Sequence, residues 1–149
     1  LSRVYQVIDM VVTPAGAPVA MVHCNTCTSD LDAWVRVFGE ALEAAGAGLD
    51  KPVLYGLLYR KSLEGDADCG GLTAFNCYSG EPVAGVDSGC PLLMRPPEAR
   101  LSLANLMRAH LYAAMAALKM GMDLLTGEEG VTLDQLQGHG GLFKTPGAA

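Results

Sequence analysis

The chain has 149 residues, a length that fits one domain, and half of them are apolar, which is enough for a hydrophobic core. Charged residues make up only 17% of the sequence, which argues against extensive disorder, and the formal net charge of -6 argues against a nucleic-acid partner, which would need a basic face. No apolar run is long enough to span a bilayer, so we expect no membrane partner.

Two strands are predicted first. Residues 4–12 are rich in β-branched side chains and end at Thr13-Pro14-Ala15-Gly16, where proline and glycine favour a turn. Residues 18–23 then form the second strand, and the two make a hairpin.

Two helices follow. A side-chain oxygen of Ser29 or Asp30 can cap the first helix, which keeps an apolar face at three- and four-residue spacing and ends at a pair of glycines. The second helix begins at Asp50, carries Pro52 in its first turn and ends by Gly65.

The remaining chain contains a long loop and the longest helix. Residues 66–98 are rich in glycine and proline, which predicts a loop with one or two short strands. Ser102 caps a helix whose apolar period continues to Gly127. Residues 133–137 are predicted to form a short strand that leads into a glycine turn and a further helix.

The glycine turn is the first candidate site. Gly138-His139-Gly140-Gly141 precedes Leu142-Phe143-Lys144-Thr145, and glycines let a flat base or a phosphate approach the backbone. Lys144 would add charge and Thr145 a hydroxyl. The pattern is neither a Walker A sequence nor a Rossmann fingerprint, so an ordinary strand-to-helix turn remains the alternative.

A second candidate is the CxxC of Cys24 and Cys27, with His23 beside it. It could hold zinc or act as a redox pair. A structural zinc site needs four ligands, however, and the sequence has no second CxxC. The alternative is a tight corner of small residues in which Asn25 and Thr26 make hydrogen bonds. The odd number of cysteines, five, argues against a disulfide scaffold and indicates a reducing, cytoplasmic location.

Other polar residues have structural interpretations. His110 lies on the apolar side of the long helix and is predicted to be a core histidine rather than a catalytic one. Glu64, Asp66 and Asp68 could bind a cation, but a solvated helix end is the simpler interpretation. Core packing is predicted for the methionines of the long helix, which are Met107, Met115, Met120 and Met122.

Three stretches occur in a characteristic order. They are NTCTSDLDAW from residue 25, GLTAFNCYSGEP from residue 71, and RAHLYAAM from residue 108 leading to the glycine turn. Their order and spacing resemble the C-terminal lobe of the FGGY carbohydrate kinases, xylulokinase-like members in particular, over nearly the whole chain. The resemblance implies an α/β fold that is part of an actin-like, ribonuclease H-like ATPase lobe.

The resemblance also implies a nucleotide pocket for ATP with Mg²⁺. Two glycines match the motif that meets the adenosine, two residues lie just beyond it, and three match the helix start on the other side of the pocket. In that order, the matching positions are Gly140, Gly141, Lys144, Thr145, Ser29, Asp32 and Ala33.

The sequence departs from the family in two places. Gly80-Glu81-Pro82 lacks the arginine of the usual Gly-x-Arg-x-Pro element, and His139 stands where many members have a third glycine. The departures bear on the identity of the sugar and on nucleotide affinity.

The resemblance predicts a kinase that transfers the γ-phosphoryl group of ATP to a hydroxyl of a small sugar, with a pentulose such as xylulose expected. The family's catalytic aspartate belongs to the N-terminal, sugar-binding lobe. Both ends look cut, so we expect residues 1–149 to be an incomplete C-terminal lobe without that N-terminal lobe. The isolated chain would then be inactive, would bind nucleotide weakly, and would self-associate, for example as a homodimer, through unpaired strand edges.

Two alternatives stay open. One is a non-catalytic ATP-binding or regulatory module of the same fold. The other is a metal or redox domain that uses Cys24 and Cys27.

Overall fold

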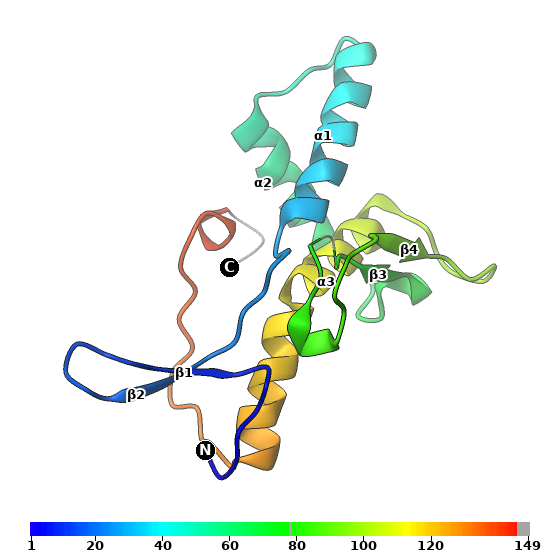
Figure 1. Cartoon of the computed structure of the whole chain (residues 1–149). Coiled ribbons are helices and arrows are strands. Elements are labelled where there is room, and N and C mark those ends of the chain that lie inside the picture. Colours follow the sequence, from blue (N-terminus) through cyan, green and yellow to red (C-terminus); the bar gives the residue numbers. More distant parts are fainter. Residues whose placement is uncertain (78, 146–149) are drawn as a thin grey trace.

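Three helices carry the centre of the fold, because each keeps one apolar face that the other two can cover. The computed structural model describes residues 1–77 and 79–145, in which these helices are α1 (Ser29–Ala44), α2 (Lys51–Ser62) and α3 (Leu103–Asp123). Figure 1 shows α1 and α2 side by side at one end of the long α3 helix, and both pack against α3.

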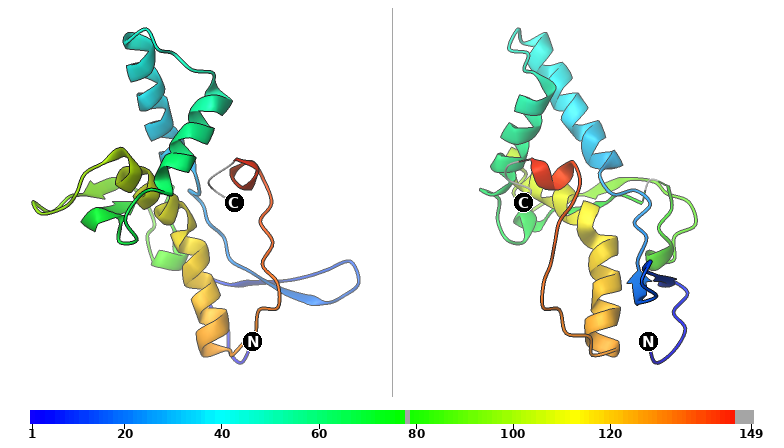
Figure 2. Two further views of the ribbon diagram at one scale, coloured as in Figure 1. Left: turned by 180° about the vertical axis from the view of Figure 1, so that it is seen from behind. Right: turned by 90° about the vertical axis from the view of Figure 1, so that its left-hand side faces the viewer.

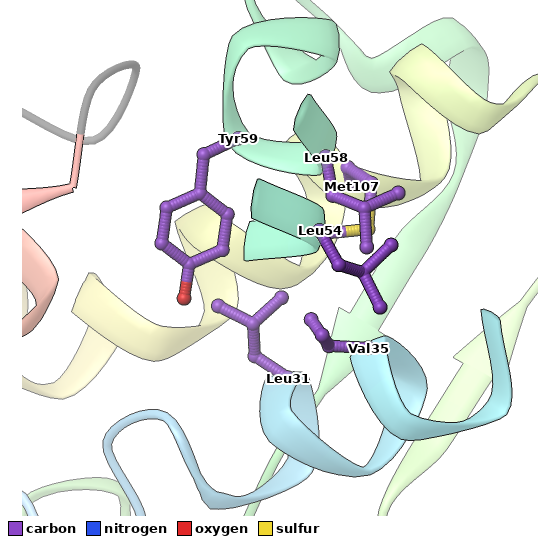
Figure 3. Close-up of a cluster of buried hydrophobic side chains, with 6 residues drawn as sticks. All are labelled: Leu31, Val35, Leu54, Leu58, Tyr59 and Met107. Atoms are coloured by element: carbon purple, nitrogen blue, oxygen red, sulfur yellow. The ribbon is translucent and has the colours of Figure 1, made fainter. Parts of the chain in front are cut away.

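The main core lies where the three helices meet (Figure 3). Its buried side chains are Leu31, Val35, Leu54, Leu58, Tyr59 and Met107. A second cluster around Leu72 and Leu106 joins α3 to the long loop. Core packing is therefore confirmed for Met107, which has no exposed surface, whereas Met120 is 44% exposed and the prediction is wrong there.

Most predicted helix ends are confirmed. The Ser102 hydroxyl accepts a hydrogen bond from the Asn105 N–H at 3.1 Å, and Pro52 lies in the first turn of α2. The predicted cap of α1 is wrong, because Thr28 is the N-cap and makes no side-chain capping bond in the described chain. Asp30 is instead buried, and the Ser29 N–H at the start of the helix donates to the Thr26 carbonyl at 3.0 Å.

The predicted hairpin forms, but it is shorter than expected. β1 (Asp9–Val12) pairs antiparallel with β2 (Pro18–Met21), with Asp9 opposite Met21. The first residues do not join the strand, because Ser2 and Tyr5 donate hydrogen bonds to Glu129 just beyond α3. The N-terminus therefore lies near the far end of that helix (Figure 1).

The long loop contains two short strands, as predicted. β3 (Thr73–Phe75) and β4 (Leu92–Met94) pair antiparallel and form a second small sheet. Tyr78, part of the second family-like stretch, lies outside the described residues. The mixture of helices and small sheets agrees with the α/β class.

The predicted strand at residues 133–137 is wrong. Residues 131–141 are exposed and pair with none of the described strands, and an alternating pattern without a partner edge does not make a strand. After a π-turn at Leu124–Glu128, the chain returns from the far end of α3 toward α2 (Figure 2). A single 3-10 turn, Leu142–Lys144, replaces the predicted helix, and residues 146–149 lie outside the described part.

Among residues 1–77 and 79–145, none of the helices combines the length and the apolar character that crossing a bilayer requires.

Candidate functional site

A cavity of about 500 Å³ lies between the start of α1, one side of α2 from Lys51 to Tyr59 and the C-terminal turn. Its size falls in the range of small-molecule sites, roughly 300–1,000 Å³. The residues around it are Thr28, Asp32, Lys51, Pro52, Tyr55, Tyr59, Gly141, Leu142, Lys144 and Thr145.

Helix geometry and the returning chain bring these side chains together. Lys51, Tyr55 and Tyr59 follow one another at four-residue spacing, so they share one face of α2. The C-terminal segment closes the opposite side, since Leu142 packs against the main core and holds the 3-10 turn beside α2. Neighbouring Lys144 and Thr145 therefore face the same cavity.

A tyrosine and a carboxylate connect α2 to α1 at the cavity wall. The Tyr55 hydroxyl donates a hydrogen bond to Asp32 Oδ1 at 2.9 Å. Partial burial, together with the Asp32 carboxylate, raises the pKa of Tyr55 to about 12, so the hydroxyl remains a donor at neutral pH. Tyr59 stands edge-on to Tyr55, with ring centroids 5.7 Å apart, and burial raises the pKa of Tyr59 as well.

The cavity is locally cationic although the chain is acidic overall. Lys51 and Lys144 contribute two positive charges, against the single carboxylate of Asp32 among the described residues that surround the cavity. Lys51 Nζ lies 5.7 Å from the centroid of the Tyr55 ring, a cation–π distance. A cationic cavity in a chain of net charge -6 favours an anionic ligand at this place.

The predicted nucleotide contacts divide into two groups. Asp32, Gly141, Lys144 and Thr145 line the cavity, although Asp32 lies more than 100 residues before the others. By contrast, the residues that flank them in sequence, Ser29, Ala33 and Gly140, are not part of its lining.

Sequence reasoning missed several residues of the lining. They are Thr28, Lys51, Pro52, Tyr55, Tyr59 and Leu142. The signal for three of them was present, because a lysine and two tyrosines at four-residue spacing mark one polar and aromatic helix face.

The cysteine segment forms a tight corner. Thr26 is buried and its hydroxyl accepts a hydrogen bond from the Ser79 N–H at 3.2 Å, as the corner interpretation predicts. Asn25 takes part through its backbone N–H, which donates to Glu81, and among the described residues its side chain has no hydrogen-bond partner. Burial raises the pKa of the Cys24 thiol, which disfavours the reactive thiolate. In the part of the chain that the structure describes, no group of three or more histidine, cysteine, aspartate or glutamate side chains could hold a metal ion.

His110 is a core residue, as predicted, but it is poorly satisfied. Its ring is 2% exposed, and Nδ1 lies 3.2 Å from Asp30 Oδ2 without the alignment of a hydrogen bond. Trp34 covers the ring at a centroid distance of 5.1 Å. Burial lowers the pKa of His110 although the Asp30 carboxylate acts in the opposite direction, so the imidazole is neutral.

The acidic group near residue 66 is used for structure. Asp66 pairs with Arg100 at 2.8 Å and accepts a hydrogen bond from the Asn105 amide. Asp68 accepts from the Gly70 N–H and caps a 3-10 turn. These contacts favour the structural interpretation over a cation site.

A glycine, two lysines and two tyrosines thus surround one cavity. The model of the FGGY family of carbohydrate kinases, C-terminal domain, matches residues 3–149, and the chain therefore belongs to this family. Searches of curated proteins and of solved structures gave no match. The family's C-terminal domain is part of the actin-like, ribonuclease H-like ATPase fold, and its kinases use ATP, typically with Mg²⁺, and a sugar substrate.

Proposed function

We propose that the cavity between α1, α2 and the C-terminal turn binds the ATP of a sugar kinase, and that this chain is the nucleotide side of that enzyme. The main support is the meeting of Asp32 with Gly141, Lys144 and Thr145 around one cavity. The family match assigned none of these positions, and the resemblance placed them on opposite sides of a nucleotide pocket.

The lining offers a group for each part of the nucleotide. Tyr55, which is half-buried, presents aromatic surface to the base, and the two lysines attract the phosphates. Gly141 leaves room, since a Cβ atom placed there would meet nothing within 4 Å. The hydroxyl of Thr145 is suited to a ribose hydroxyl.

Magnesium would be held mainly by the phosphates. Kinase sites bind Mg²⁺ through substrate phosphates and one or two carboxylates, and Asp32 is the carboxylate of this cavity. When bound, the metal neutralises charge on the transferred phosphoryl group. The residues of this chain bind and orient the nucleotide, and Ser29, Ala33 and Gly140 are predicted to contact it at the edges of the cavity.

Phosphoryl transfer also requires an acceptor and a base. The reaction is an in-line displacement that depends on positioning and on charge stabilisation. We propose that the base is an aspartate of a sugar-binding N-terminal lobe, that the acceptor is a pentulose such as xylulose, and that the enzyme is cytoplasmic. The chain by itself would then bind ATP weakly and would transfer nothing.

Isothermal titration with Mg²⁺-ATP tests the nucleotide site. Lys144→Ala or Lys51→Ala should weaken binding by about tenfold, because each removes a charge-assisted contact. Lys119→Ala is the matched control, since this exposed lysine pairs with Asp123 on α3. Equal affinities of the Lys144→Ala and Lys119→Ala variants would contradict the assignment.

Phosphorylation assays test the reaction. The full-length kinase that contains this domain should phosphorylate one member of a panel of pentuloses, hexuloses and polyols. Turnover of xylulose would support the proposed substrate. Binding of ATP without turnover of any sugar would favour the non-catalytic ATP-binding module.

A further inference from the structure

Asn76, Ser79 and Glu81 form hydrogen bonds with the segment that leads into α1. The Asn76 side-chain amide donates a hydrogen bond to the Cys27 carbonyl at 2.9 Å, and the Ser79 N–H donates to Thr26 Oγ1 at 3.2 Å. A third contact runs the other way, from the Asn25 N–H to Glu81 Oε1 at 3.3 Å. These contacts connect residues more than 45 positions apart in the sequence, and we call the three residues Asn76, Ser79 and Glu81 the clasp.

The segment that the clasp contacts contains one residue, Cys27, in an unfavourable backbone conformation. Cys27 has a φ of 44°, in the left-handed region that disfavours residues with a Cβ atom. Such a conformation persists only where the surroundings fix it. Asn76 supplies that support by holding the carbonyl of Cys27 itself, and the buried hydroxyl of Thr26 holds the residue before it.

The clasp is itself well fixed. The Glu81 backbone exchanges two hydrogen bonds with Val86, at 2.7 and 3.2 Å. Gly80, at φ 75°, lies so close to this bridge that a Cβ atom would come within 2.5 Å of the Asp87 carbonyl oxygen. The Glu81 side chain is buried, with 3% of the residue exposed, although no cation pairs with it in the described chain. Its carboxylate therefore serves the Asn25 N–H and the nearby Cys24 thiol.

The residues that the clasp contacts, residues 25–27, are followed directly by the first turn of α1, which lines the cavity. The Ser29 N–H donates to the Thr26 carbonyl at 3.0 Å, and the Asp32 N–H donates to the Thr28 carbonyl at 2.8 Å. Thr28 and Asp32 are the α1 residues of the cavity lining. The path from the clasp to the cavity is thus a few hydrogen-bonded residues long.

We propose that Asn76, Ser79 and Glu81 are positioning residues, which hold Cys27 in its left-handed conformation and so place Thr28 and Asp32 for the nucleotide. The proposal rests on the proposed function of the cavity. None of the three clasp residues lines the cavity, so they act through the first turn of α1.

A double-mutant cycle between Asn76→Ala and Cys27→Gly tests the clasp in the complete chain. Asn76→Ala should weaken Mg²⁺-ATP binding by about three- to tenfold, the usual net effect of one hydrogen bond. Glycine adopts a positive φ without strain, so Cys27→Gly should make the clasp less necessary. The double variant should therefore recover most of the lost affinity, and the two changes should not be additive.

Hydrogen exchange without nucleotide separates the clasp from the function of the cavity. The amides of Ser29 and Asp32 should exchange faster in Asn76→Ala and regain protection in the double variant. Thr26→Val removes the acceptor and keeps the shape, so it should speed exchange at these amides as Asn76→Ala does. Thr26→Ser keeps the acceptor and should have a smaller effect on exchange.

Unchanged exchange at both amides in Asn76→Ala, or an equal loss of ATP affinity with and without Cys27→Gly, would overturn the proposal. Absence of ATP binding by the unaltered chain would instead contradict the proposed function. The exchange data alone would then decide whether the clasp positions the first turn of α1.

Discussion

The three-helix core and the β1–β2 hairpin are both rich in apolar residues, but only the core buries them. Leu31 and Met107 are at most 1% exposed, whereas Met10 and Val12 of β1 are 52% and 70% exposed. Three amphipathic helices can cover one another's apolar faces, but a two-stranded hairpin leaves two faces and two edges open. The candidate nucleotide cavity lies beside the three-helix core, whereas the hairpin leaves much of its apolar surface exposed.

Removal of a core side chain should have the largest effect on stability. Met107→Ala should lower the free energy of unfolding by about 2–5 kcal/mol, because it leaves a cavity among three helices. Met120→Ala, at an exposed position of the same helix, should change it by no more than about 0.5 kcal/mol. Urea denaturation measures both, and equal losses would contradict the assigned core.

The next largest effect on stability is expected from overpacking the contact between the hairpin and α3. A Cβ atom at Gly121 of α3 would lie 2.2 Å from Val22 Cγ2, just after β2. Gly121→Ala should therefore destabilise the protein by about 1 kcal/mol, because overpacking outweighs the gain in helix propensity. At Gly127 the added methyl group meets nothing within 4 Å, so Gly127→Ala should be neutral or stabilising in the same denaturation assay. Stabilisation by Gly121→Ala would mean that the hairpin does not pack there.

Stability should depend on pH through His110. Its pKa is lowered in the folded state from the ordinary 6.5, so below that pH the unfolded state takes up a proton that the folded state does not. The contribution is thus complete above about pH 6.5 and is lost as the pH falls toward the folded-state pKa. Unfolding measured from pH 7.5 to 5 should show this slope in the wild type and a flatter one in His110→Gln. An unchanged slope in His110→Gln would contradict the assignment.

The exposed hairpin should affect association more than stability. Val12→Lys should weaken self-association of the chain in sedimentation velocity, because a charge at an open strand opposes pairing with another copy. The unfolding free energy should change by no more than about 0.5 kcal/mol. Val37→Lys places the same charge on the exposed side of α1 and should leave association unchanged. A wild-type chain that stays monomeric at all concentrations would contradict this prediction.

Local sequence signals predicted the helices well. The Ser102 cap, the Pro52 start and the apolar period of α3 each depend on neighbours within one or two turns. The prediction of a strand at residues 133–137 was wrong, because a strand forms only where it can pair with the edge of another strand. A local sequence pattern does not show whether such an edge is nearby.

In the candidate site, too, only part of the lining could be predicted from the sequence. The resemblance supplied Asp32 and the turn at Gly141, but Tyr55 and Tyr59 join the cavity only because the C-terminal segment returns along the helices. The clasp contact from Asn76 to the Cys27 carbonyl is equally remote in sequence. Such long-range placement could not be read from composition or periodicity.

Hydrogen exchange of the chain with and without Mg²⁺-ATP can show whether nucleotide binds in the cavity between α1, α2 and the C-terminal turn. We expect nucleotide to protect residues 28–32, 51–59 and 141–145 together, because one ligand contacts all three segments. Protection confined to another part of the chain, or no protection at nucleotide concentrations that support binding, would show that this cavity is not the nucleotide site.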